Sequence, residues 1–182
     1  MYKVKLVNPL FGLATAAFLL AACQSNAYHI KGEAKGYEDG EVLYIADGLG
    51  HDARPTDSII VTEGRFVLHG ETDTARFCRL YRAADPQQEV TFFLEPGNIY
   101  IEMSDRPARS RVSGTVANNG WQALNDKVAA SDRELRRILH DEKADRTTQV
   151  KAVYNRLDRE IRMSAARNDG NAFGRFISTH YE

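Results

Sequence analysis

The 182-residue chain has few cysteines and no excess of either charge. Two cysteines are too few for a disulfide-rich scaffold or a four-cysteine zinc site. The formal net charge of −1 lacks the basic excess of a dedicated nucleic-acid-binding protein, so we expect no nucleic-acid partner. With 43% hydrophobic and 27% charged residues, the composition is that of a globular protein, not of a disordered or multi-span membrane protein.

A long hydrophobic run is also missing near the N-terminus. The apolar stretch from Leu10 to Ala22 has 13 residues, whereas a transmembrane helix needs about 20. Two lysines, Lys3 and Lys5, precede it. A short basic segment followed by a short apolar segment is typical of a signal peptide, which we place at residues 1–22.

The apolar stretch ends in Leu-Ala-Ala-Cys at residues 20–23, which resembles a bacterial lipobox. The resemblance predicts cleavage between Ala22 and Cys23 and diacylglycerol on the Cys23 thiol, with residues 23–27 as a tether. It also implies the envelope of a Gram-negative bacterium. Gln24 in place of aspartate favours the outer membrane, and the lack of an acidic run after Cys23 favours its periplasmic face. The alternative is an ordinary secretory peptide with a chance cysteine.

Residues 28–115 show a two-residue period, with turn-forming residues every 8 to 12 positions. Ile99, Ile101 and Met103, for example, alternate with polar neighbours. Turns are expected at Ala84-Asp85-Pro86 and Glu95-Pro96-Gly97-Asn98, among others. The pattern predicts an antiparallel β-sandwich or barrel-like domain with strands at 28–33, 41–46, 57–61, 65–70, 75–82, 89–94, 98–103 and 111–113.

From residue 118 the period changes to 3.6, which predicts a helical hairpin within residues 116–182 and an α+β chain overall. Asn118 or Asn119 is the expected N-cap of the first helix, residues 145–148 cap the second, and residues 168–170 end it. A short third helix is expected within 171–181. Two apolar stripes should face inward: Trp121, Leu124, Val128, Leu135, Ile138 and Leu139, and then Val150, Val153, Tyr154, Leu157 and Ile161.

Trp121 is the only tryptophan and lies where the first helix leaves the β-domain. We expect its indole to pack against the end of the sandwich or against the second helix, near Tyr154 or Leu157. Residues 23–115 carry a net charge of −5 and residues 116–182 a net charge of +2. The arginines of the helices, including Arg133, Arg136 and Arg137, either form pairs such as Asp132–Arg136 or face anionic lipid or a partner.

The β-half resembles the family called domain of unknown function 4369. The most specific blocks are Phe92-Phe93-Leu94-Glu95-Pro96-Gly97-Asn98-Ile99 and Val112-Ser113-Gly114-Thr115. Further blocks precede them in order, at Tyr28–Gly32, Gly40–Tyr44, Asp57–Ser58 and Gly64–Gly70. In this family the β-domain often precedes helices and a thioredoxin-like domain of the peroxidase or thiol-disulfide type. This sequence has no Cys-x-x-C, and Cys78 is the only cysteine besides Cys23, so we expect no oxidoreductase activity from it.

Other candidate sites each have two interpretations. His51-Asp52 either binds a metal weakly or orients a substrate, or it is an exposed loop pair. Cys78 is either a thiol activated by arginines or a small buried side chain. Aromatic residues form either a ligand-binding strip or the core: Tyr28, Tyr37, Tyr44, Tyr81, Phe92, Phe93 and Tyr100. No His-Glu-x-x-His, Gly-x-Ser-x-Gly or Walker pattern occurs, so no metal, cofactor or catalytic residue is predicted.

The leading hypothesis is a non-enzymatic envelope lipoprotein, anchored through acylated Cys23, whose β-domain binds or scaffolds an envelope protein and whose helices dock. One alternative is the non-catalytic, membrane-tethering part of a thiol-disulfide or peroxidase-like system. Another is a glycan- or peptide-binding lipoprotein.

Overall fold

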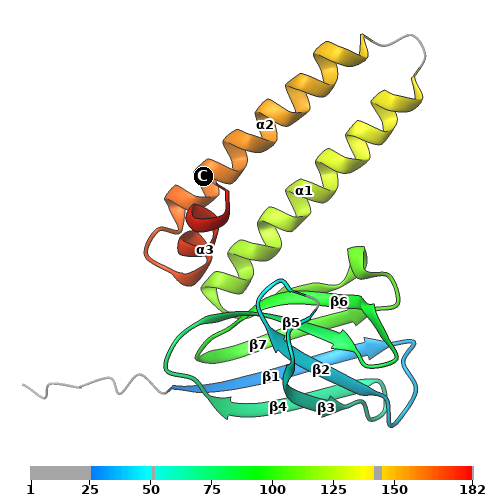
Figure 1. Cartoon of the computed structure of the whole chain (residues 1–182), viewed down its shortest axis with the longest axis vertical. Coiled ribbons are helices and arrows are strands. Elements are labelled where there is room, and N and C mark those ends of the chain that lie inside the picture. The colour runs from blue at the N-terminus through cyan, green and yellow to red at the C-terminus, as the bar shows by residue number, and fades with distance from the viewer. Residues whose placement is uncertain (1–25, 51, 142–144, 182) are drawn as a thin grey trace, which may run out of the picture.

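A computed structural model describes residues 26–50, 52–141 and 145–181. Within these residues the chain forms eight strands and then three α-helices (Figure 1). The strands are β1 Ala27–Lys35, β2 Val42–Asp47, β3 Pro55–Ile60, β4 Arg65–Glu71, β5 Arg76–Arg82, β6 Asp85–Leu94, β7 Gly97–Ser104 and β8 Arg111–Ser113. A short 3₁₀ helix, Pro107–Arg109, precedes β8, and the α-helices are α1 Val116–His140, α2 Arg146–Arg167 and α3 Ala172–His180.

The strands form two four-stranded sheets, in the orders β4-β1-β7-β8 and β3-β2-β5-β6. Every neighbouring pair is antiparallel except β1 and β7, which run parallel. The predicted class, a largely antiparallel sandwich followed by helices, is therefore confirmed. The parallel pair arises because the chain crosses from one sheet to the other after β6 and enters β7 alongside β1.

The core lies between the sheets and is built from alternate residues of the strands. Ile99, Ile101 and Met103 of β7 are buried, as their alternation predicts. Phe66 of β4 points across Gly32 of β1, its partner in the register. A Cβ on Gly32 would lie 1.9 Å from the Phe66 ring, so the ring position requires glycine there.

Two predicted turns are wrong in detail. The turn before β6 consists of residues 83 and 84, while Asp85 and Pro86 are already in the strand. Proline has no backbone N–H to donate. It is tolerated there because β6 is an edge strand, and the N–H groups on its outer side have no neighbouring strand to bond. Residues 95–98 do not join a pair of neighbouring strands, because β6 and β7 belong to different sheets. Gly97, with φ of +123°, turns the chain between them.

The helix ends largely follow the predicted caps. The Asp145 side chain accepts from the Thr148 N–H at the start of α2, and Asn168 is its C-cap. Asn171 caps α3. The expected cap of α1 is wrong, since Thr115 occupies that position and accepts from the Asn118 N–H.

The helices α1 and α2 form a hairpin that projects away from the sandwich, and α3 folds back at its base (Figure 1). The predicted helical hairpin is thus confirmed. Among the described residues of this hairpin, only the first part of α1 contacts the sheets, so most of the hairpin is an arm without support from the β-domain.

Candidate functional site

The predicted processing and lipidation residues, Ala22 and Cys23, lie outside the described residues, and so does His51. None of the helices in the described ranges is long and apolar enough to cross a membrane. The candidate functional features of the described residues are the junction between sandwich and helices, the surface of the arm, Cys78 and a pair of histidines.

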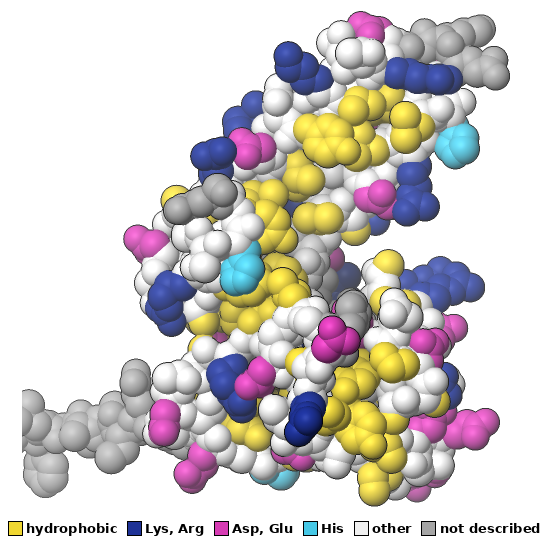
Figure 2. All heavy atoms as spheres, in the orientation of Figure 1, with side chains coloured by type: hydrophobic (Ala, Val, Ile, Leu, Met, Phe, Trp, Pro, Cys, Tyr) yellow, Lys and Arg dark blue, Asp and Glu magenta, His cyan; other side chains and the backbone are white. Residues whose placement is uncertain are grey.

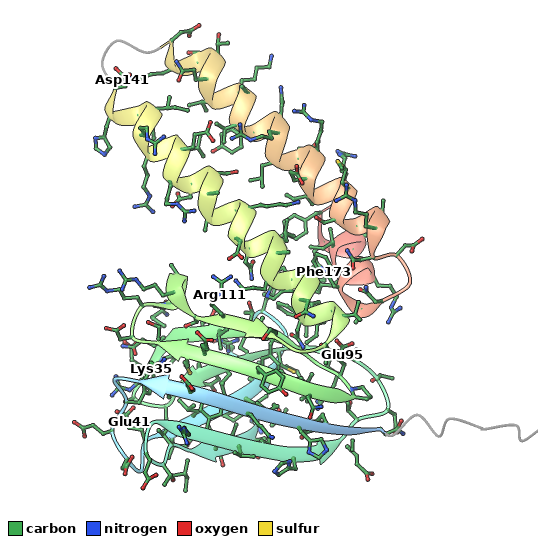
Figure 3. The ribbon with its side chains drawn as sticks, turned by 180° about the vertical axis from the view of Figure 1, so that it is seen from behind. Lys35, Glu41, Glu95, Arg111, Asp141 and Phe173 are labelled. Carbon is green, nitrogen blue, oxygen red and sulfur yellow. The ribbon has the colours of Figure 1, made fainter. Side chains whose placement is uncertain are left out.

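An aromatic cluster joins the helices to the outer face of the β3-β2-β5-β6 sheet. The Trp121 indole is 8% exposed and lies edge-on to Phe77 of β5 and Phe93 of β6. Phe173 and Phe176 of α3 close the cluster from the other side. Figure 3 shows Phe173 at the base of the hairpin.

The predicted packing of Trp121 against the sandwich is therefore confirmed. The predicted contact with the second helix near Tyr154 or Leu157 is wrong. The Trp121 Nε1–H donates to the carbonyl and the hydroxyl of Thr91, each at 3.1 Å. Its helical partners come from α3, whereas Tyr154 is exposed on α2. The reason is that α3 folds back into the space that a two-helix hairpin would leave open beside the sheet.

Hydrogen bonds to backbone groups fix the start of α1. The buried Asn118 amide accepts from the Phe93 N–H and donates to the Phe93 carbonyl, both at 2.8 Å. The Glu95 carboxylate accepts from the Ala117 N–H at 3.2 Å, where the partial positive charge of a helix N-terminus favours an anion. Gln122 accepts from the Val112 N–H at 2.8 Å. Together these contacts hold the helix at a fixed angle to the sheet.

One face of the arm exposes apolar side chains. Leu139 of α1 and Tyr154 of α2 are each 58% exposed, and Val128 of α1 is 42% exposed. These positions correct the prediction that the complete stripes point inward. The buried residues of the arm, among them Ile138 and Val153, form a narrower seam between the helices.

We call this face the arm face and define it by Val128, Leu135 and Leu139 of α1 with Val150, Tyr154, Leu157 and Ile161 of α2. Within each helix successive residues of this set are three, four or seven positions apart, and so they lie on one side of the helix. Figure 2 shows hydrophobic side chains running along both helices of the hairpin on the face turned to the viewer.

Charged residues of the arm are partly tied into ion pairs. The predicted Asp132–Arg136 pair is present at 2.9 Å, and Arg162 pairs with Asp158 at 3.0 Å. Lys127 and Glu160 pair across the two helices. These pairs support the interpretation of the arginines as solvated helix faces, and as exposed pairs each contributes little to stability.

Cys78 is fully buried in the core, which supports its interpretation as a small buried side chain. Burial, together with the neighbouring Asp47 carboxylate, raises the pKa of its thiol to about 12. The thiolate is the reactive form of cysteine, so this thiol is unsuited to nucleophilic or redox chemistry at neutral pH.

Most of the aromatic residues proposed for a binding strip lie in the core. Tyr28, Tyr37, Tyr81, Phe92 and Phe93 are all less than 9% exposed. Of the two others, Tyr44 is half-buried, and Tyr100 is exposed on the opposite sheet. Packing thus accounts for these residues, and they do not form a continuous strip.

Two polar features were missed at the sequence level. Arg79 of β5 is 1% exposed and pairs with Glu89 at 2.7 Å while donating to the Gly50 carbonyl at 2.9 Å. His29 of β1 and His69 of β4 lie directly opposite one another. The predicted strands 28–33 and 65–70 contain these two histidines, but the sequence carries no local signal that pairs strands 40 residues apart.

Comparison with known families agrees with the β-fold. The family model described as Domain of unknown function (DUF4369) matches residues 28–121. The chain belongs to the DUF4369 family. The match covers the whole sandwich and extends to Trp121, so the DUF4369 segment includes the start of α1 with its contacts to β6. No curated protein matches the chain.

Proposed function

We propose that this DUF4369 protein is a non-enzymatic lipoprotein of the bacterial envelope, anchored through acylated Cys23, with its β-domain as a scaffold and its helical arm as a docking element. The observation that carries the docking role is the exposed apolar arm face, held at a fixed angle by the junction at Trp121 and Asn118. The anchor rests on the lipobox-like residues 20–23.

Exposed apolar surface supports docking because large contiguous apolar patches on folded proteins commonly mark interaction sites. The arm face combines such residues on two adjacent helices, which is the arrangement that a third helix or an apolar surface packs against. Basic residues such as Arg146 and Lys151 border it next to Tyr154, around a hollow of about 500 Å³. We propose an envelope protein as the partner.

The anchor and the docking role are tested separately. In cells, Cys23→Ala is expected to move the protein out of the membrane fraction or to leave it unprocessed.

A photo-crosslinking residue at Leu139 or Tyr154 is expected to give one discrete adduct with an envelope protein, and Val128→Glu is expected to abolish this adduct. The same crosslinker at Arg159, an exposed polar position of α2, is the control. No adduct, or equal adducts at all three positions, would contradict the docking role.

A second candidate is the non-catalytic part of a thiol-disulfide or peroxidase-like lipoprotein, as the family resemblance implies. An apolar hollow of about 310 Å³ between α2 and α3, lined by Ile161, Ala165, Ile177 and Tyr181 among others, favours it, because a neighbouring domain would cover this surface. The genomic sequence after Glu182 separates the two candidates. An open reading frame that continues into Trp-Cys-x-x-Cys supports the second, and a stop codon supports the first.

A further inference from the structure

His29 and His69 form a histidine pair on the outer face of the β4-β1-β7-β8 sheet. They are direct partners in the antiparallel register of β1 and β4, and both side chains are exposed. Their Nδ1 atoms are 2.7 Å apart, and their rings meet edge to face with centroids 4.9 Å apart. Figure 3 looks onto this sheet and shows β1 and β4 side by side.

The pair is arranged for chelation. Two Nδ1 atoms in hydrogen-bond contact require that one ring present a lone pair, and neutral imidazole nitrogen is a preferred ligand of Cu²⁺, Zn²⁺ and Ni²⁺. Two nitrogens bound to one metal at about 2.0–2.1 Å and at a right angle are about 2.9 Å apart. The observed separation of 2.7 Å is close to this spacing, so a metal can bridge the two nitrogens once the shared proton leaves and both rings turn their lone pairs toward it.

The surroundings leave room for further ligands. His29 borders an open hollow of about 650 Å³, whose wall also includes Asn26, Asp73 and Asn98. Asn98 of β7 is the register partner of His29 on its other side, and the Asp73 carboxylate accepts from the Asn26 amide at 2.8 Å. Solvent can reach the pair, so water can complete a coordination shell.

We propose that His29 and His69 form a cross-strand, two-nitrogen site for Cu²⁺, open to solvent at the start of β1. A bite near 90° suits the tetragonal geometry of Cu²⁺ better than the tetrahedral geometry of Zn²⁺. Cu²⁺ also binds nitrogen ligands most tightly among the divalent metals of the first row. Among the described residues no group of three or more His, Cys, Asp or Glu side chains converges, which fits an open site rather than a closed structural one.

The test is a Cu²⁺ titration of the full chain in detergent, without an affinity tag, followed by electron paramagnetic resonance. All samples carry Cys23→Ser, so that the remaining thiol is the buried Cys78. We expect one tight Cu²⁺ per chain, with hyperfine coupling to two imidazole nitrogens. His29→Ala and His69→Ala are each expected to weaken Cu²⁺ binding at least tenfold. The double variant is expected to bind Cu²⁺ as weakly as the single variant with the lower affinity.

His140→Ala and His180→Ala, at exposed positions of α1 and α3, are the matched controls and should bind Cu²⁺ as the parent does. Because both histidines of the pair are exposed, their removal is expected to leave the circular dichroism spectrum unchanged. Unaltered affinity in either His29→Ala or His69→Ala, or a spectrum with a single imidazole nitrogen in the parent, would overturn the proposal. Zn²⁺ binding tighter than Cu²⁺ would also overturn it.

Discussion

The Asn118 side chain pairs with both backbone groups of Phe93, as a neighbouring strand would do. Its amide accepts from the Phe93 N–H and donates to the Phe93 carbonyl, each at 2.8 Å. Phe93 lies on β6, an edge strand of its sheet. An open edge invites pairing with other chains, and here the first turn of α1 occupies part of that edge.

Asn118→Ala is therefore expected to destabilise the protein by about 2–4 kcal/mol, because it leaves two buried backbone groups unpaired. Asn119→Ala is the matched control, since Asn119 is exposed and accepts a single bond from the Gly114 N–H. Its expected cost is at most about 1 kcal/mol. Chemical denaturation measures both, and equal costs for the two variants would contradict the role of Asn118.

Trp121→Ala is expected to cost about 3–5 kcal/mol, because it empties the centre of the aromatic cluster. Trp121→Phe keeps most of the ring and loses the donation to Thr91, so it should cost less. Since the chain has one tryptophan, native emission should be blue-shifted and poorly quenched by iodide. A water-like emission maximum with full quenching would show that the indole is exposed.

Much of the β-half was predictable because its strands alternate and its turn residues are distinctive. Each of the eight expected strands is present, and residues such as Ile99 and Ile101 face the core. The order of the sheets, and the parallel pairing of β1 with β7, depend on contacts far apart in the sequence. The pairing of His29 with His69 also depends on such contacts, so the sequence did not predict it.

The helical half shows where periodicity misleads. An apolar stripe predicted a fully buried face, yet Tyr154 and Leu139 are exposed, because α1 and α2 pack only on each other along most of the arm. Asn118 looked like a helix cap because asparagine is common there. Its actual partner, the backbone of Phe93, is 25 residues away and leaves no local pattern.

Neighbouring residues of α2 test the packing of the arm. Val153 is 1% exposed, and Val153→Ala is expected to cost about 1–3 kcal/mol through lost burial and the cavity it leaves. Tyr154 is 58% exposed, and Tyr154→Ser should change stability by no more than about 1 kcal/mol. Urea denaturation compares them, and a larger cost for Tyr154→Ser would mean that the arm face is packed within the monomer.

Because of the Cys78 thiol, the free energy of unfolding is expected to depend on pH in the alkaline range. Its pKa is about 12 in the folded protein, above the ordinary value of about 8.5, so the folded state holds the proton that the unfolded state releases. This contribution to stability is fully present below about pH 8.5 and is lost as pH rises towards 12. The slope is at most about 1.4 kcal/mol per pH unit.

Cys78→Ala isolates this effect, since all other titrating groups are common to both proteins. The stability of the parent relative to Cys78→Ala should fall between pH 9 and pH 11 and stay constant between pH 6 and pH 8. In addition, iodoacetamide at pH 8 should modify Cys78 only after denaturation. Rapid alkylation of the native protein at Cys78 would show an accessible, reactive thiol.

Mass spectrometry of the protein isolated from bacterial membranes tests the proposed lipid anchor. We expect a chain that begins at Cys23, with the added mass of a diacylglycerol group on that residue. A chain that keeps residues 1–22, or one cleaved elsewhere without acyl groups, would contradict it.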